Sequence, residues 1–192
     1  MTIAAGFADP ALGAQATFRC LLEAIAHPGR IVRVPDRLPA PPAPLLAPAW
    51  ATALTLLDFE TPLWVDPSLA APAVIDSLRL HCGCPIVEQA KARFALLAGS
   101  GAALAAFDQG TPEYPDRSAT LIWQVTSLAA GRGVRLTGPG IRTNTLLHVE
   151  GLPADFWALW GMSHRQFPLG VDVMLVTDNQ LAALPRSIEV QA

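Results

Sequence analysis

The sequence contains little charge and no basic cluster. Of its 192 residues, 15% are Asp, Glu, Lys or Arg, whereas 52% are hydrophobic. The formal net charge is −3, and the arginines are scattered from Arg19 to Arg186. Because nucleic-acid binding needs a concentrated basic surface, we expect no nucleic acid partner. The apolar balance also indicates that part of the surface contacts other proteins.

Lysine is almost absent, which bears on cofactor chemistry. The single lysine, Lys91, lies in a polar stretch between Glu88 and Arg93. A pyridoxal-phosphate enzyme needs a lysine in a pocket that lowers its pKa, so that it can form the Schiff base. Lys91 is typical of a solvated surface residue instead. We therefore expect no pyridoxal phosphate and no other cofactor.

Cysteine is scarce as well. Cys20, Cys82 and Cys84 are an odd number and too few for a disulfide framework, which fits a reducing compartment. His81 stands next to the close pair Cys82 and Cys84, and such a group resembles half of a metal site. A closed zinc site needs four ligands, and the sequence offers no second ligand pair. Buried thiols without a metal are the favoured interpretation.

A membrane-spanning helix is not expected. Residues 38–57 carry no charge, but five prolines interrupt the segment at positions 39, 41, 42, 44 and 48. Proline lacks the amide donor and clashes with the preceding turn, so the first half is predicted to be an extended loop. The N-terminal residues lack the basic and apolar regions of a secretory signal. We expect a cytoplasmic protein.

The hydrophobic pattern predicts an α/β fold in which a mixed β-sheet is flanked by helices, as one domain over residues 1–192. Asp9 and Pro10 are typical of a helix start, and Phe18, Leu21, Leu22 and Ile25 recur on one helical face. That helix should end at residues 27–29. Further helices are expected at 49–57, 71–80, 101–107 and 153–161, and strands at 30–34, 62–65, 94–97, 118–125, 133–137, 146–149, 171–176 and 181–184. We expect 118–125 to pair with 133–137 around a turn at Ala130-Gly131.

No motif for catalysis stands out. The chain has no Gly-x-Ser-x-Gly elbow, and Gly138-Pro139-Gly140 lacks the Lys and Ser/Thr of a phosphate-binding loop, so a tight turn is favoured there. Asp58 with Glu60, and Glu113 with Asp116, could do acid-base work or hold a metal, but solvated loops explain both pairs. The histidines at positions 81, 148 and 164 have no local partner. We assign no catalytic residue.

Asp172 is the most informative polar residue, because it lies in an otherwise apolar strand. A buried carboxylate without a partner is costly, so it should contact an arginine or backbone donors. Arg79 and Arg186 are the candidate partners. With His81 these residues form the candidate ligand or interface cluster, namely Arg79, His81, Asp172 and Arg186. A structural ion pair is favoured over a catalytic one.

Six blocks of sequence, spread over nearly the whole chain, form an ordered pattern, although each is only weakly specific by itself. The blocks are Phe18-Arg19 with Leu21-Leu22 and His27-Pro28-Gly29; Thr55-Leu56-Leu57-Asp58 with Glu60-Thr61 and Trp64; Arg79-Leu80-His81 before Pro85; Gly110 with Tyr114-Pro115 and Ser118-Ala119-Thr120-Leu121-Ile122; Leu136-Thr137-Gly138-Pro139-Gly140-Ile141; and Phe167-Pro168-Leu169-Gly170-Val171-Asp172. Taken in order, they resemble the PhnH family of the carbon-phosphorus lyase core complex. Cys82 and Cys84 depart from the family pattern.

The resemblance implies a fold related to that of pyridoxal-phosphate-dependent transferases, without the cofactor site. It also implies a homodimer, and assembly with the subunits PhnG, PhnI and PhnJ. In the family, that assembly supports transfer of an alkylphosphonate to the ribose of ATP with loss of adenine, which yields ribose 1-phosphonate 5-triphosphate. The displacement is attributed mainly to PhnI and carbon-phosphorus cleavage to the radical iron-sulfur subunit PhnJ. This chain lacks the cysteine triplet of such a cluster.

Two functions therefore stand against each other. The first is a non-catalytic subunit that supports a transferase complex through its apolar surfaces. The alternative is a stand-alone module that binds a nucleotide or a phosphonate near Arg79, His81 and Asp172. An independent enzyme is disfavoured, because a nucleophile, a cofactor lysine and a metal set are all missing from the sequence.

Overall fold

The first helix of the computed structural model, α1, forms as the sequence predicts. The structure describes residues 3–99 and 103–191. α1 spans Pro10–Ala26, the carboxylate of Asp9 accepts a hydrogen bond from the Leu12 amide at 3.0 Å, and proline occupies the first turn. Capping of this kind satisfies an amide that has no partner within the helix. The predicted helix start is confirmed.

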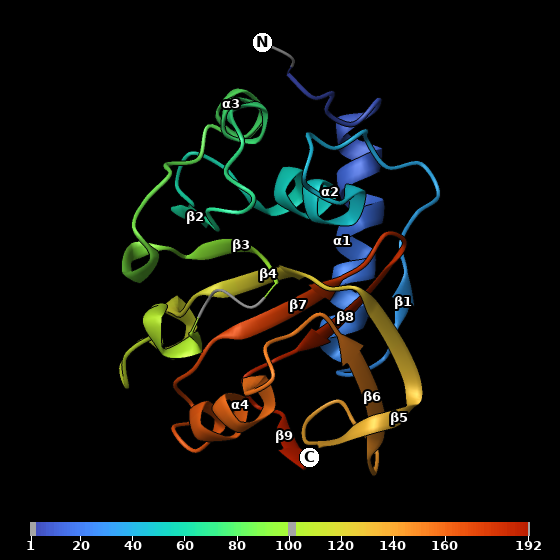
Figure 1. Cartoon of the computed structure of the whole chain (residues 1–192), viewed down its shortest axis with the longest axis vertical. Coiled ribbons are helices and arrows are strands. Elements are labelled where there is room, and N and C mark those ends of the chain that lie inside the picture. Colours follow the sequence, from blue (N-terminus) through green and yellow to red (C-terminus); the bar gives the residue numbers. More distant parts are fainter. Residues whose placement is uncertain (1–2, 100–102, 192) are drawn as a thin grey trace.

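A six-stranded mixed sheet forms the centre of the molecule (Figure 1). Its order is β1-β8-β7-β4-β3-β2. Neighbours from β2 to β7 pair in parallel, whereas β8 runs antiparallel to both β7 and β1. The strands are β1 (Val32–Arg33), β2 (Leu63–Val65), β3 (Phe94–Ala98), β4 (Thr120–Gln124), β7 (Asp172–Val176) and β8 (Gln180–Leu184). The expected α/β class with a mixed sheet is confirmed.

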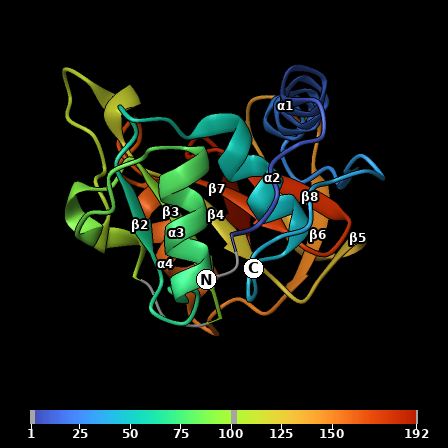
Figure 2. The ribbon, with the colours of Figure 1, turned by 90° about the horizontal axis from the view of Figure 1, so that it is seen from above.

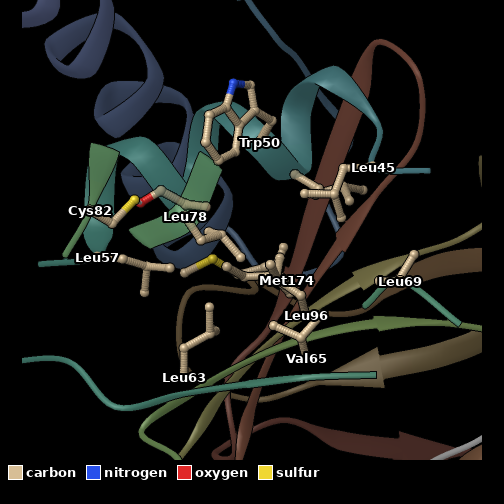
Figure 3. Packing of buried hydrophobic residues seen from close by; sticks show 14 of the residues in the cluster. Leu45, Trp50, Leu57, Leu63, Val65, Leu69, Leu78, Cys82, Leu96 and Met174 are labelled. Atoms are coloured by element: carbon tan, nitrogen blue, oxygen red, sulfur yellow. Dashed lines mark hydrogen bonds between the residues drawn. The ribbon is translucent and has the colours of Figure 1, made fainter. Parts of the chain in front are cut away.

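Helices and a second sheet cover the two faces of this sheet (Figures 1 and 2). One face packs against α1, α2 (Ala47–Leu56) and α3 (Pro72–His81), and the other against α4 (Phe156–His164) and a small sheet. Successive residues of β4 alternate between the two cores, since Ile122 belongs to the first and Leu121 and Trp123 to the second. Burial on both faces explains why the central strands are continuously apolar. Figure 3 shows the first core, where Trp50 and Leu78 from the helices lie above Leu96 and Met174 from the sheet.

The small sheet corrects two predictions. It is antiparallel, in the order β6-β5-β9, and contains β5 (Ser127–Thr137), β6 (Thr145–Glu150) and β9 (Glu189–Gln191). β4 pairs with β3 and β7 instead of with residues 133–137, so the predicted pairing is wrong. The predicted turn at Ala130-Gly131 is wrong as well, because β5 continues through it with a register shift between Ala130 and Val134. Glycines in a strand can mark a bulge as well as a turn.

The helix predicted at residues 101–107 is partly testable. Residues 101 and 102 lie outside the described part of the chain, and the remainder contains only the 3₁₀ turn η2 (Leu104–Ala106). Two similar turns are η1 (Gln89–Lys91) and η3 (Pro115–Arg117). In residues 3–99 and 103–191, no helix has the length and apolar character needed to cross a bilayer.

The apolar face of α1 is only partly core. Leu21 is 2% exposed and packs inside with Thr17 and Ala24. Phe18, Leu22 and Ile25 are 49%, 53% and 41% exposed. These three residues follow one another at spacings of four and three, so they lie on one side of the helix. We call them the α1 stripe.

Candidate functional site

Asp172 and Arg186 form an ion pair where β7 begins and just after β8 ends. Oδ1 of Asp172 accepts from the backbone amide of Arg186 at 2.8 Å and from its Nε at 3.2 Å, and Oδ2 lies 2.5 Å from Nη2. Nη1 of Arg186 donates to the Pro115 carbonyl. The side chains are 30% and 17% exposed, so the pair is largely buried. The expectation that Asp172 contacts an arginine is confirmed for Arg186.

Arg79 and His81 lie elsewhere, on α3. The Arg79 side chain is exposed, and no ion pair joins it to Asp172 within the described residues. Nε2 of His81 donates to the Ala4 carbonyl at 2.8 Å, and its ring stands edge-on to Trp50 with centroids 5.7 Å apart. His81 therefore fastens the N-terminal segment to the helical layer. The structure divides the four candidate residues into two separate pairs, and a role for either pair in binding stays a prediction.

Two hollows flank Asp172. One is a cavity of about 140 Å³, lined by Ile25, Thr120, Asp172, Val173, Met174, Ala183 and Pro185. The other is a shallower pocket of about 370 Å³, lined by Pro115, Asp116, Phe167, Pro168, Asp172, Pro185, Arg186 and Ser187. Arg186 is the one cation among these lining residues, and its guanidinium is already held by Asp172 and Pro115. A phosphonate or nucleotide would find no free positive charge there.

At the carboxyl ends of the parallel strands, the chain itself covers the sheet. Parallel sheets bind ligands in crevices outside the carboxyl ends of their strands. At the carboxyl end of β4, Oε1 of Gln124 accepts from the Leu46 amide at 2.6 Å, and its Nε2 donates to the Pro44 carbonyl at 3.5 Å. Leu45 is 4% exposed and belongs to the first core. The proline-rich segment thus occupies the position over β4 where a ligand would lie.

The remaining candidates have structural explanations. A Cβ on Gly140 would lie 2.5 Å from the Ala26 carbonyl oxygen, and one on Gly138 would lie 3.0 Å from that of Ser187, so the predicted tight turn packs directly against other backbone. The four carboxylates at positions 58, 60, 113 and 116 are exposed. Within residues 3–99 and 103–191, no group of three or more His, Cys, Asp or Glu side chains is placed to hold a metal ion.

The thiols of Cys82 and Cys84 are buried in the first core. The Cys82 thiol, labelled in Figure 3, lies 3.8 Å from the Ala53 carbonyl, to which it can donate. The hydrogen bond to Cys84 and burial raise the pKa of Cys82, and burial likewise raises the pKa of Cys20. The same hydrogen bond lowers the pKa of Cys84, so only Cys82 is held as a neutral thiol, which is a poor nucleophile.

Sequence reasoning missed two polar contacts. Gln124 carried no signal, because a polar residue at a strand end is common and its partner Leu46 lies 78 positions away. The second contact is on the small sheet, where Ser127 and His148 both bond to Glu150, at 2.7 and 3.3 Å. These hydrogen bonds lower the pKa of the Glu150 carboxyl. The two-residue spacing of His148 and Glu150 on a strand, which puts both on one face, could have indicated it.

Comparisons with known proteins agree along the whole chain. A family model described as "Bacterial phosphonate metabolism protein (PhnH)" matches residues 5–191. The "Alpha-D-ribose 1-methylphosphonate 5-triphosphate synthase subunit PhnH" of Rhizobium meliloti (strain 1021) is 39% identical over 189 residues, which cover 96% of this chain and 94% of the relative. The "Putative C-P lyase subunit protein HtxG" of Stutzerimonas stutzeri is 35% identical over 176 residues, covering 92% and 85%.

Proposed function

Because this chain belongs to the PhnH family of bacterial phosphonate metabolism proteins, we propose that it is a non-catalytic subunit of the carbon-phosphorus lyase core complex. The complex transfers an alkylphosphonate to the ribose of ATP and releases adenine, as a ribose 1-phosphonate 5-triphosphate synthase in organic phosphonate catabolism. Within the complex, this chain has a structural role and supports assembly of the other subunits. Its companions are PhnG, PhnI and PhnJ.

One observation carries the proposal. The match to both relatives extends over almost their full lengths, and both are named as subunits of a larger enzyme. A chain that shared only a fold with them would not match at this identity from α1 to β9.

The geometry of the candidate site supports a non-catalytic part. The guanidinium of Arg186 is already bound to the Asp172 carboxylate and the Pro115 carbonyl, and the proline-rich segment covers the carboxyl end of β4. The alternative of a stand-alone module for a nucleotide or phosphonate loses its main support, because Arg79 and His81 lie apart from Asp172. Calorimetric titration of the isolated chain with ATP and with methylphosphonate should release no binding heat, and a saturable signal would revive that alternative.

The proposal has finer parts. The chain folds as one domain over residues 1–192, is cytoplasmic, forms a homodimer when isolated, and has a fold related to pyridoxal-phosphate-dependent transferases without the cofactor site. Lys91 supports the last point, because it is 73% exposed and pairs with Glu88 at 3.3 Å on the surface. The α1 stripe supports association, because exposed apolar side chains that lie together favour contact with another protein.

Co-expression tests the proposal. The tagged chain is produced together with PhnG, PhnI and PhnJ from the same organism and purified by affinity, and the mass and stoichiometry of the product are measured. We expect all four chains in a fixed ratio. A matched control replaces the tagged chain by an unrelated tagged protein of similar size and charge. Recovery of the other three as a complex that excludes this chain would contradict the proposal.

A further inference from the structure

β6 is an open edge of the small sheet. It is the last strand in the order β6-β5-β9 and pairs with β5 alone (Figure 1). Beyond that ladder, the backbone of β6 has one hydrogen bond to another backbone group in the described residues, from the Thr126 amide to the Glu150 carbonyl at 2.8 Å. The amides and carbonyls that point away from β5 therefore have no backbone partner in residues 3–99 and 103–191. Such a row is a template for a further strand.

The other sheet edges are short or closed. At the β2 edge, the Leu63 amide donates to the Pro85 carbonyl at 2.8 Å, and the Leu63 carbonyl accepts from the Val87 amide at 2.9 Å. β1 has two residues and β9 has three. β6 has six residues, Thr145–Glu150, and contains neither proline nor lysine. Shortness, proline and lysine, three of the usual protections of an edge strand, are thus missing at β6, whereas the other edges are short or already paired.

The hairpin that carries this edge is basic, although the protein is acidic. Residues 127–150 contain three arginines and one glutamate, a net charge of +2, so the rest of the chain carries −5 of the total of −3. Arg132, Arg135 and Arg142 are all exposed, and none forms an ion pair within the described residues. An acidic partner would be complementary to this surface.

We propose that β6 accepts an acidic, extended segment of a companion subunit as a fourth strand of the small sheet. Main-chain hydrogen bonds give affinity in this mode of recognition, and side-chain pockets and charges give specificity. Pairing of β6 with a second copy of this chain is disfavoured, because it would bring two hairpins of charge +2 together. The inference rests on the proposed assembly, since it names one contact within it.

Hydrogen exchange measured by mass spectrometry tests the contact in the intact complex. The peptide that covers residues 145–150 should exchange at least about tenfold more slowly in the complex than in the isolated chain, because formerly open amides become bonded. If the complex forms and this peptide exchanges at an unchanged rate, the inference is overturned while the proposed function stands. If no complex forms at all, the proposed function fails. Slowing that depends on the concentration of the isolated chain would show β6 pairing with a second copy, which also overturns the inference.

A charge reversal tests the acidity of the partner segment. The variant R132E/R135E should weaken assembly at least tenfold in the dissociation constant, and the loss should be smaller at high salt, where charges are screened. The matched control is R33E/R37E, which makes the same change of charge at two exposed arginines outside the hairpin and should assemble normally. Circular dichroism verifies that both variants fold. Equal affinity of the two variants would overturn the acidic character of the partner.

Discussion

At the scale of single residues, the Asp172–Arg186 pair joins the two ends of the β7–β8 hairpin and links them to a segment that is distant in sequence. The carboxylate lies at the start of β7, the guanidinium follows β8, and the accepting carbonyl of Pro115 belongs to η3. A charge that loses its partner in such a largely buried place keeps its desolvation cost and loses the compensating attraction. The pair is therefore better seen as a fastener between strands than as a reacting group.

Replacing Asp172 by alanine should destabilise the fold by about 2 kcal/mol, toward the low end for a broken buried pair because both groups retain some exposure. Urea unfolding followed by circular dichroism measures the change. Adding R186A to D172A should cost less than the sum of the two single changes, since the second removes a charge already unpaired. The control D178A, at an exposed turn residue, should stay within about 0.5 kcal/mol of the parent. A D172A value within that same range would contradict the fastener role.

Gly29 and Gly131 offer a matched test of close packing. Both have positive φ, +77° and +78°, which costs any other residue backbone strain. A Cβ at Gly29 would lie 2.6 Å from Leu136 Cδ1 and 2.7 Å from Thr145 Cγ2, whereas one at Gly131 would meet nothing within 4 Å. We expect G131A to cost about 1 kcal/mol and G29A about 2–3 kcal/mol in the free energy of unfolding. Equal losses in the free energy of unfolding would show that the segment after α1 is not closely packed against the small sheet at Gly29.

At the scale of elements, α1 shows how periodicity can predict a helix without fixing which side is buried. Residues 18, 21, 22 and 25 predict the helix correctly, but the sheet and α2 cover the side that contains Thr17, Leu21 and Ala24. The exposed α1 stripe contributes little to the stability of the fold and is available for contact with another protein. The sequence contains both stripes, and only tertiary packing distinguishes them.

Serine substitution separates the two sides of α1. The triple variant F18S/L22S/I25S should change the free energy of unfolding by less than about 1 kcal/mol, because these side chains stay half-exposed in the fold. The single change L21A should cost about 2–5 kcal/mol, because it empties part of the core. The triple variant should also shift the sedimentation of the isolated chain toward the monomer. A triple variant that is as unstable as L21A would place the stripe in the core after all.

The proline-rich segment depends on Gln124. Removing this side chain in Q124A leaves the partly buried Leu46 amide without its acceptor, at a cost of about 1 kcal/mol. The segment should then loosen, so trypsin should cut after Arg37 several-fold faster than in the parent. Q15A, at an exposed position on α1, is the control and should leave the cleavage rate unchanged. Unchanged cleavage in Q124A would mean that Leu45 alone holds the segment.

Local chemistry explains which parts of the fold were predictable. The cap at Asp9 and the apolar runs of β4 and β7 are properties of adjacent residues, so their positions follow from the sequence. Asp172 and Arg186 are also near neighbours, because a two-strand hairpin joins them. The errors concern distant contacts: the place of α3 separates Arg79 and His81 from Asp172, and the second sheet takes β5 away from β4. No local pattern encodes those choices, since they depend on which layers close the core.

At the scale of the whole molecule, one sheet is shared by two cores. Trp50 lies in the first core and Trp123 and Trp160 in the second, and β3, β4, β7 and β8 contribute alternate residues to both. Neither core can lose its packing without exposing the other face of the same strands. The layers should therefore unfold together.

A single transition is the expected result. Urea unfolding of residues 1–192, followed in parallel by tryptophan fluorescence and far-ultraviolet circular dichroism, should give coincident curves with one midpoint. Coincidence would fit the one-domain proposal. Two separated midpoints would instead show that the small sheet and α4 melt apart from the three-helix side.

The strand order also bears on how the protein is synthesised. Val32 of β1 pairs with Leu181 of β8, and β7 and β8, which join β1 to the rest of the sheet, are encoded near the end of the chain. A ribosome that adds roughly 5–20 residues per second needs roughly 7–30 s to travel between those two positions. During that interval α1 has emerged without the strands that cover Leu21 and Ala24. The nascent polypeptide must stay soluble with its first helix only partly covered, and it completes its sheet only as translation ends.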